Sequence, residues 1–111
     1  AMRRLLRHGL QAVFASNDWM AMGALRALEE AGLRVPDQLA LVGFDDMPFA
    51  ATSKPPLTTV RQPIAEIGEA AARMLVELVE GESAAPRHMV LPTHLGVRES
   101  CGASQRIRGG T

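Results

Sequence analysis

Several features that would identify particular classes of protein are scarce in this sequence. One cysteine, Cys101, is present among 111 residues, so no disulfide can form within the chain, which fits a reducing compartment. No apolar stretch approaches the ~20 residues that a transmembrane helix needs. The 12 basic and 12 acidic residues balance, so charge gives no indication that this chain binds nucleic acid or a membrane surface.

Motifs for several kinds of chemistry are also missing. There is no Gly-x-Gly-x-x-Gly, no phosphate-binding loop ending in Lys-Ser/Thr, and no metal-type Cys/His spacing. The histidines are scattered, at His8, His88 and His94. Ser100 and Cys101 have no recognisable base, which argues against nucleophilic catalysis. We therefore expect no enzyme, no catalytic residue, no cofactor and no metal site.

The most informative stretch is 39–46, Leu-Ala-Leu-Val-Gly-Phe-Asp-Asp. Its short, continuous apolar run predicts a strand over 39–44 that is buried on both faces, as in a parallel sheet. Asp45 and Asp46 follow at the carboxyl end, where open α/β sheets bind ligands. Adjacent side chains at a strand end tend to point to opposite sides, which argues against a catalytic carboxylate pair.

The remaining sequence alternates between helical and strand patterns. We expect a short helix over 2–9, further helices over 18–31 and 63–80, and further strands over 12–15, 57–60, 89–91 and 95–97. From Ser100 onward the chain is polar and contains glycine, so we expect a loose tail. Strands that alternate with helices of this length predict an α/β fold with a mostly parallel sheet flanked by helices.

The predicted helix 18–31 has an unusual outer side. At about 100° per residue, its alanines and leucines form one broad apolar side, and the opposite side carries Arg26 and Glu30 together with Trp19 and Met22. Isolated apolar residues are common on protein surfaces. Interfaces, however, are enriched in Trp, Met and Arg. We favour a partner-binding surface and keep scattered surface residues as the alternative.

Two polar residues are expected at the same edge of the sheet. Asn17 follows strand 12–15 and Asp45 follows strand 39–44, and the carboxyl ends of parallel strands meet at one edge. An amide beside a carboxylate suits a small molecule that is rich in hydroxyl groups. Simple capping of the next helix is an equally good explanation of Asn17 and Asp18.

Several segments, in order, resemble the LacI/GalR family of bacterial transcription regulators. They are 13–25 with its Asn-Asp-x-x-Ala-x-Gly-Ala pattern, 32–37, 42–46, 55–63, the single positions 68, 71, 75 and 81, and finally 91–92 with 97–100. The resemblance covers about residues 11–100. Each segment alone carries little weight, but their common register is specific.

This resemblance implies a DNA-binding helix-turn-helix domain, a hinge and a two-lobed effector-binding core like that of type I periplasmic sugar-binding proteins. The chain resembles only the last third, a partial C-terminal lobe without the helix-turn-helix. Residues 1–10 would then end a preceding helix, 11–100 would form the C-terminal portion of the effector-binding and dimerisation domain, and 101–111 would be the tail.

The family also implies roles for individual residues. The positions that match its effector-contacting residues are Asn17, Asp45, Gln62 and Ile64. The positions on its dimerisation surface are Trp19, Met22, Arg26, Glu30, Thr52, Ser53 and Pro55. The implied partners are a small-molecule effector, a sugar or related polyol, and a second copy of the chain, with DNA contacted only through the helix-turn-helix. The implied location is the cytoplasm, without membrane contact.

One alternative within the same fold is a fragment of a periplasmic sugar-binding protein of a transport system. The Pro-Pro-Leu-Thr-Thr-Val-x-Gln-Pro run at 55–63 and the Val-Arg-Glu-Ser ending at 97–100 favour the regulator.

Overall fold

The computed structural model describes residues 1–82 and 87–104, which fall into two compact units. The first unit contains Ala1–Arg61 and the chain from His94 onward, and the second contains Gln62–Thr93. Within the described residues, no helix combines the length and the apolar character needed to cross a bilayer.

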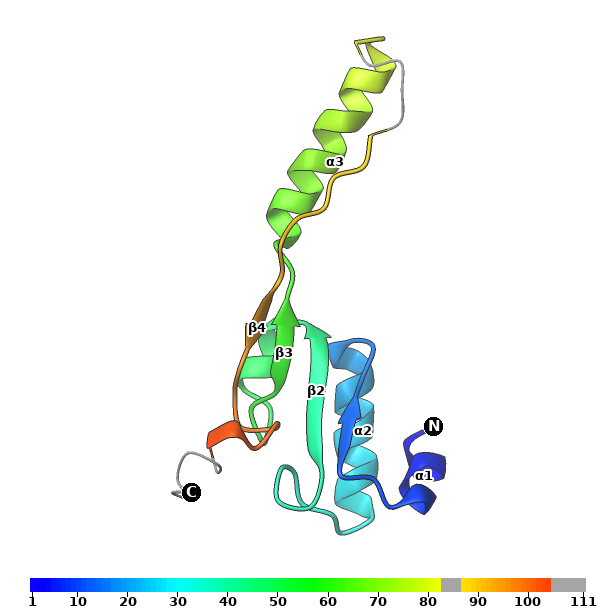
Figure 1. The fold of residues 1–111 in the computed structure, drawn as a ribbon, viewed down its shortest axis with the longest axis vertical. Helices are drawn as coiled ribbons and strands as arrows, with labels where there is room; N and C mark the ends of the chain where they lie inside the picture. Colours follow the sequence, from blue (N-terminus) through cyan, green and yellow to red (C-terminus); the bar gives the residue numbers. More distant parts are fainter. Residues whose placement is uncertain (83–86, 105–111) are drawn as a thin grey trace. The chain divides into compact units, whose positions relative to one another are not determined.

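A mixed sheet forms the centre of the first unit (Figure 1). Its strands lie in the order β1 (Ala12–Phe14), β2 (Ala40–Asp45), β3 (Thr58–Arg61) and β4 (His94–Gly96). β1, β2 and β3 are parallel, and β4 is antiparallel to β3. The predicted α/β fold with a mostly parallel sheet is therefore confirmed.

Helix α2 (Asp18–Glu30) packs against β2 and agrees closely with the predicted helix 18–31. Its small residues Ala21 and Ala24 are buried, which lets the helix approach the sheet, and Leu28 is fully buried. The predicted apolar side of the helix is thus the side that meets the core.

Two shorter helical segments complete this unit. The chain begins with α1 (Met2–Leu5), which continues as the 3-10 turn η1 (Leu6–His8) and ends at Gly9 with φ 64°. A second 3-10 turn, η2 (Pro48–Ala51), follows the carboxylates of β2. The core contributed by these segments and the sheet includes Met2, Leu39, Leu41, Ala50 and Leu57.

The second unit consists of α3 (Ile64–Val79) and the extended chain that returns beside it (Figure 1). Arg87 in the returning chain forms an ion pair with Glu77 of the helix. The prediction of a strand over 89–91 is wrong, since the structure has no regular element there. A strand needs a neighbouring strand to satisfy its backbone N–H and C=O groups, whereas this segment lies next to a helix.

Helix α3 leaves most of its large apolar residues exposed. The periodicity predicts the helix correctly, yet none of its residues is buried. Leu75 is 62% exposed and Val79 is 80% exposed. A helix with a pronounced apolar side normally packs that side against other protein.

The chain around Ser100 is not the loose tail that its composition predicts. Ser100 is fully buried. Its hydroxyl donates to Leu41 O at 2.6 Å and accepts from Thr58 N at 2.8 Å, so one side chain connects β2 with β3. Residue 101 lies in a turn and residues 103–104 are helical, and 105–111 lie outside the described residues.

Candidate effector site and partner surface

The carboxyl ends of β1, β2 and β3 meet at one edge of the sheet, as predicted. β2 ends at Asp45, which lies opposite Arg61 in the register of β2 and β3. The backbone there is unusual, because Asp45 has φ 114° and Asp46 has φ 58°. Positive φ is uncommon for residues with a Cβ and is concentrated at functional sites.

The two neighbouring carboxylates have different surroundings. Asp46 is engaged in ion pairs, with Arg98 Nη2 2.9 Å from Oδ1 and Arg61 Nε 3.9 Å from Oδ2. Arg98 also donates to Leu57 O at 2.9 Å. Asp46 therefore anchors the edge of the sheet, and Asp45 is the half-buried carboxylate at the strand end. The expectation that the two do not form a catalytic pair stays a prediction.

A third carboxylate, Asp18, lies inside the protein beside this edge. It is fully buried in the first turn of α2. Its Oδ2 accepts from Met47 N at 2.7 Å, and its Oδ1 accepts from Thr59 Oγ1 at 2.6 Å. Thr59 Oγ1 in turn accepts from Asp46 N at 3.3 Å. The helix is thereby connected to β3 and to the turn after β2.

Asn17 lies at the same edge and caps α2. Its Oδ1 accepts from Met20 N at 2.8 Å, so the capping explanation of this residue is correct. Capping does not exclude ligand contact, because an asparagine side chain also carries two N–H donors. Its neighbour Asp18 bonds to Met47, two residues after Asp45, which places Asn17 and Asp45 at one edge of the sheet.

The other two predicted effector residues belong to the second unit. Gln62 is half-buried and follows Arg61 directly in the chain. Ile64 is the first residue of α3 and is 58% exposed. Their effector role stays a prediction.

The predicted partner surface begins with an aromatic pair. Trp19, at the start of α2, is 66% exposed. Its ring lies against Phe49 of η2, with centroids 4.7 Å apart. The contact places the start of α2 beside η2, which leads into Thr52, Ser53 and Pro55. Sequence reasoning missed Phe49, although an aromatic residue directly after Pro48 in a short loop was a usable signal.

Charged residues extend this surface along α2. Arg26 and Glu30 lie one turn apart, with Nε 3.4 Å from Oε1. Glu30 also accepts a hydrogen bond from Arg3 at 2.8 Å. The Arg3 guanidinium, and more weakly that of Arg26, holds the pKa of Glu30 below its usual value. Met22 is half-buried on the same helix.

The loop residues on this surface differ in accessibility. Thr52 is exposed, whereas Ser53 and Pro55 are half-buried. The Ser53 hydroxyl lies within hydrogen-bonding distance of Ala50 O and Pro55 O, at 3.1 and 2.9 Å, so it stabilises the loop internally.

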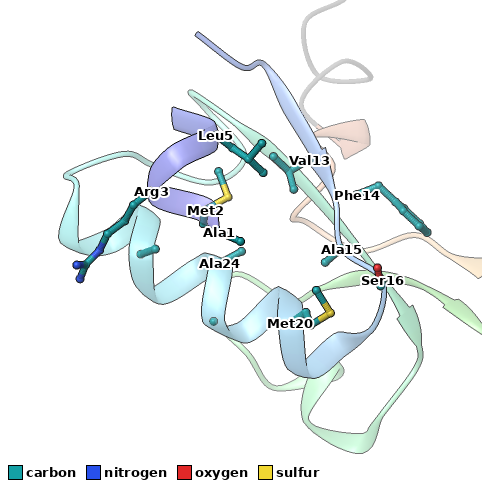
Figure 2. A pocket seen from close by; sticks show the side chains of 12 residues that line it. Ala1, Met2, Arg3, Leu5, Val13, Phe14, Ala15, Ser16, Met20 and Ala24 are labelled. Atoms are coloured by element: carbon teal, nitrogen blue, oxygen red, sulfur yellow. The ribbon is translucent and has the colours of Figure 1, made fainter. Parts of the chain in front are cut away.

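An apolar groove of about 440 Å³ lies elsewhere in the first unit, between α1, β1 and α2 (Figure 2). Leu5, Val13, Phe14, Met20 and Ala24 are among its lining residues. Binding sites for small polar molecules need several convergent polar groups. The polar side chains of this lining are Arg3, which is paired with Glu30, and Ser16. The edge of the sheet that carries Asn17, Asp45 and Asp46, called the carboxylate edge below, is therefore the better candidate for an effector site. Within residues 1–82 and 87–104, no three His, Cys, Asp or Glu side chains are grouped to hold a metal ion.

Comparisons with known proteins agree with this architecture. A family model described as periplasmic binding protein-like domain matches residues 1–101. The chain is 45% identical over 89 residues to the lactose operon repressor of Rhizobium radiobacter, covering 80% of the chain and 78% of that sequence. The chain belongs to the LacI/GalR family. The predicted resemblance is confirmed.

Other members of the LacI/GalR family are considerably longer. The chain is 47% identical over 102 residues to the transcriptional regulator CelR of Thermobifida fusca, covering 90% of the chain and 30% of CelR. It likewise spans about 30% of the regulator MalR of Streptomyces coelicolor, at 42% identity over 95% of the chain. These relatives are named as transcription regulators or repressors, in agreement with the prediction that the chain is not an enzyme.

Solved structures of LacI/GalR regulators have the same fold. A CelR–cellobiose complex matches with a TM-score of 0.86 at 47% identity, covering 90% of this chain and 31% of that one. A regulator from Enterococcus faecium with bound ribose matches with a TM-score of 0.80 at 34% identity, covering 89% and 37% respectively.

Proposed function

We propose that this chain forms part of the effector-binding and dimerisation region of a cytoplasmic LacI/GalR transcription regulator that senses a sugar or related polyol. The observation that carries the proposal is the carboxylate edge, where Asn17 follows β1 as the cap of α2 and Asp45 ends the neighbouring parallel strand β2. Carboxylate oxygens accept hydrogen bonds from sugar hydroxyls, and an amide both donates and accepts. Regulators of similar fold have been solved with cellobiose and with ribose.

The site is only partly built from this chain. In the proposal, Asn17 and Asp45 of the first unit contribute one side of the effector site. The effector role of Gln62 and Ile64, which belong to the second unit, is a separate proposal. The uncovered apolar residues of α3 support a role within a larger protein, because such a face is normally buried. The isolated chain is expected to bind sugars weakly or not at all, since ligand affinity depends on enclosure by the whole site.

DNA binding is assigned to a helix-turn-helix domain elsewhere in the regulator. The balanced charge of this chain offers no basis for releasing counterions from DNA. We therefore expect no sequence-specific DNA binding by the 111 residues alone.

We also propose a homodimer that uses the Trp19–Phe49 surface, together with Met22, Arg26, Glu30 and the loop 52–55. The exposed aromatic pair supports this, because aromatic residues and arginine are enriched at interface centres.

The alternative of a transport-system sugar-binding protein shares the two-lobed fold. The similarity to named regulators and repressors favours the regulator.

A grafting experiment tests the effector proposal. The chain would replace the matching 30% of CelR from Thermobifida fusca, and calorimetry would measure binding of cellobiose, ribose and lactose. We expect the graft to bind at least one sugar. Asp45→Ala should weaken that binding about tenfold or more, because ligand hydroxyls lose a buried acceptor.

The matched control is Asp37→Ala, which removes a carboxylate from an exposed turn. This variant should bind sugar like the unmodified graft. A folded graft that binds none of the sugars would contradict the proposed function, and equal affinity in both variants would remove Asp45 from the site.

A further inference from the structure

The turn after β2 needs support from its surroundings. Asp45 and Asp46 are consecutive non-glycine residues at positive φ, at 114° and 58°. Such conformations are strained for residues with a Cβ and persist only where neighbouring contacts determine them. The contacts that hold this turn are therefore also contacts that place the Asp45 carboxylate.

We propose that Asp18 and Thr59 are positioning residues that fix this turn and hold Asp45 ready for the effector. The inference rests on the proposed function of Asp45. Two successive backbone N–H groups follow Asp45, and both are anchored: Asp46 N donates to Thr59 Oγ1 and Met47 N donates to Asp18 Oδ2. The Thr59 hydroxyl donates to Asp18 Oδ1, which joins the two anchors.

Burial makes these hydrogen bonds strong. Asp18 and Thr59 are both fully buried, and a carboxylate is rarely buried unless it is paired. Asp18 also lies in the first turn of α2, where the partial positive charge of the helix end favours a negative group. In the described part of the chain, no buried side-chain N or O atom lacks a partner.

The arrangement joins the turn to rigid elements. Asp18 comes from α2 and Thr59 from β3, so the turn is tied to both neighbours of β2's carboxyl end. The ion pair between Asp46 and Arg98 adds a third connection, from the chain after β4. Asp45 is therefore the last residue of β2 and is followed by a fixed backbone, which lowers the ordering cost when a ligand binds.

If Thr59 only stabilised the fold, removing its hydroxyl would act like removing any other buried hydroxyl. Ser100 provides the comparison that separates this structural role from the positioning role. Both hydroxyls are fully buried, and each accepts from one backbone N–H and donates one hydrogen bond. The Ser100 hydroxyl bonds to Thr58 N and Leu41 O, whereas that of Thr59 bonds to Asp46 N of the turn and to Asp18. Thr59→Val and Ser100→Ala thus remove equivalent interactions at different places.

The first measurement is amide hydrogen exchange in the full chain, followed residue by residue by NMR. We expect Thr59→Val to speed exchange at Asp46 and Met47 about tenfold relative to global opening, because both anchors are disturbed. Ser100→Ala should leave these two amides within about twofold, and Thr59→Ser, which keeps the hydroxyl, should restore protection.

The second measurement is sugar affinity in the CelR graft. Thr59→Val should raise the Kd about tenfold, Thr59→Ser should return it close to the original value, and Ser100→Ala should change it less than about twofold. Equal effects of Thr59→Val and Ser100→Ala on affinity would overturn the positioning role.

The two measurements separate this inference from the proposed function. If the unmodified graft binds no sugar, the proposed function fails, and amide exchange alone decides whether Asp18 and Thr59 fix the turn. Unchanged protection of Asp46 and Met47 in Thr59→Val would overturn the inference whatever the graft binds.

Discussion

Gly43 in β2 lies directly against the buried carboxylate of Asp18. A Cβ added at Gly43 would approach Asp18 Oδ1 more closely than real Cβ contacts allow, and it would lie 2.9 Å from Leu57 Cδ2. The absence of a side chain at position 43 is therefore what lets Asp18 reach both of its hydrogen-bond partners.

Gly43→Ala should destabilise the protein by about 2–3 kcal/mol, because overpacking displaces a buried carboxylate from its donors. Denaturant unfolding followed by circular dichroism measures this. Gly23→Ala is the control, since a Cβ there meets nothing within 4 Å and alanine is the better helix former. Equal stability of the two variants would show that the close approach is unimportant.

Ser100→Ala should reduce stability by about 1–3 kcal/mol, because Thr58 N loses a buried acceptor. Thermal unfolding compares it with Ser104→Ala, which alters an exposed residue in the same terminal segment. The control should unfold like the unmodified chain. If both variants unfold alike, the segment from Ser100 behaves as the loose tail that its composition predicts.

Met22→Glu should shift the chain from dimer to monomer in sedimentation velocity. The change puts a charge beside Trp19, whose burial in an interface contributes about 2–3 kcal/mol. Gln38→Glu adds the same charge at an exposed turn and should leave the dimer intact.

If the chain associates through the edge of its sheet instead, a different substitution should dissociate it. Phe14 on the edge strand β1 is 63% exposed, so pairing of β1 with another chain would be sensitive to Phe14→Lys. A dimer that survives Met22→Glu and dissociates with Phe14→Lys would replace the α2 interface with edge pairing.

Arg3→Ala should raise the pKa of Glu30 towards its usual value, because the hydrogen bond and charge that lower it are removed. In the unmodified chain, the depressed pKa means that this pair stabilises the fold above the ordinary glutamate pKa. The contribution is lost as pH falls through the depressed value. NMR titration of the Glu30 carboxyl measures the shift, and Arg34→Ala serves as the control. An unchanged Glu30 titration in Arg3→Ala would contradict this pairing.

Local patterns in the sequence were sufficient to predict the main elements. Helical spacing and capping predicted α2 and α3 to within a residue or two, and the apolar run 39–44 predicted β2, which the structure has at Ala40–Asp45. Alternation of helices and strands predicted a mostly parallel sheet, and hence a shared edge for Asn17 and Asp45. These features follow from interactions between residues close in the chain, which single-sequence periodicity records.

Only the tertiary structure decided how the polar side chains are used. Asp18 and Thr59 are 41 positions apart, and Ser100 and Leu41 are 59 apart, so no local pattern indicates that they bond. The same limit explains the wrongly predicted strand at 89–91, because a strand exists only where another strand pairs with it. The sequence pattern predicted that Asp18 caps a helix and that Ser100 belongs to a loose tail. In the folded chain both side chains are fully buried and serve as hydrogen-bond partners.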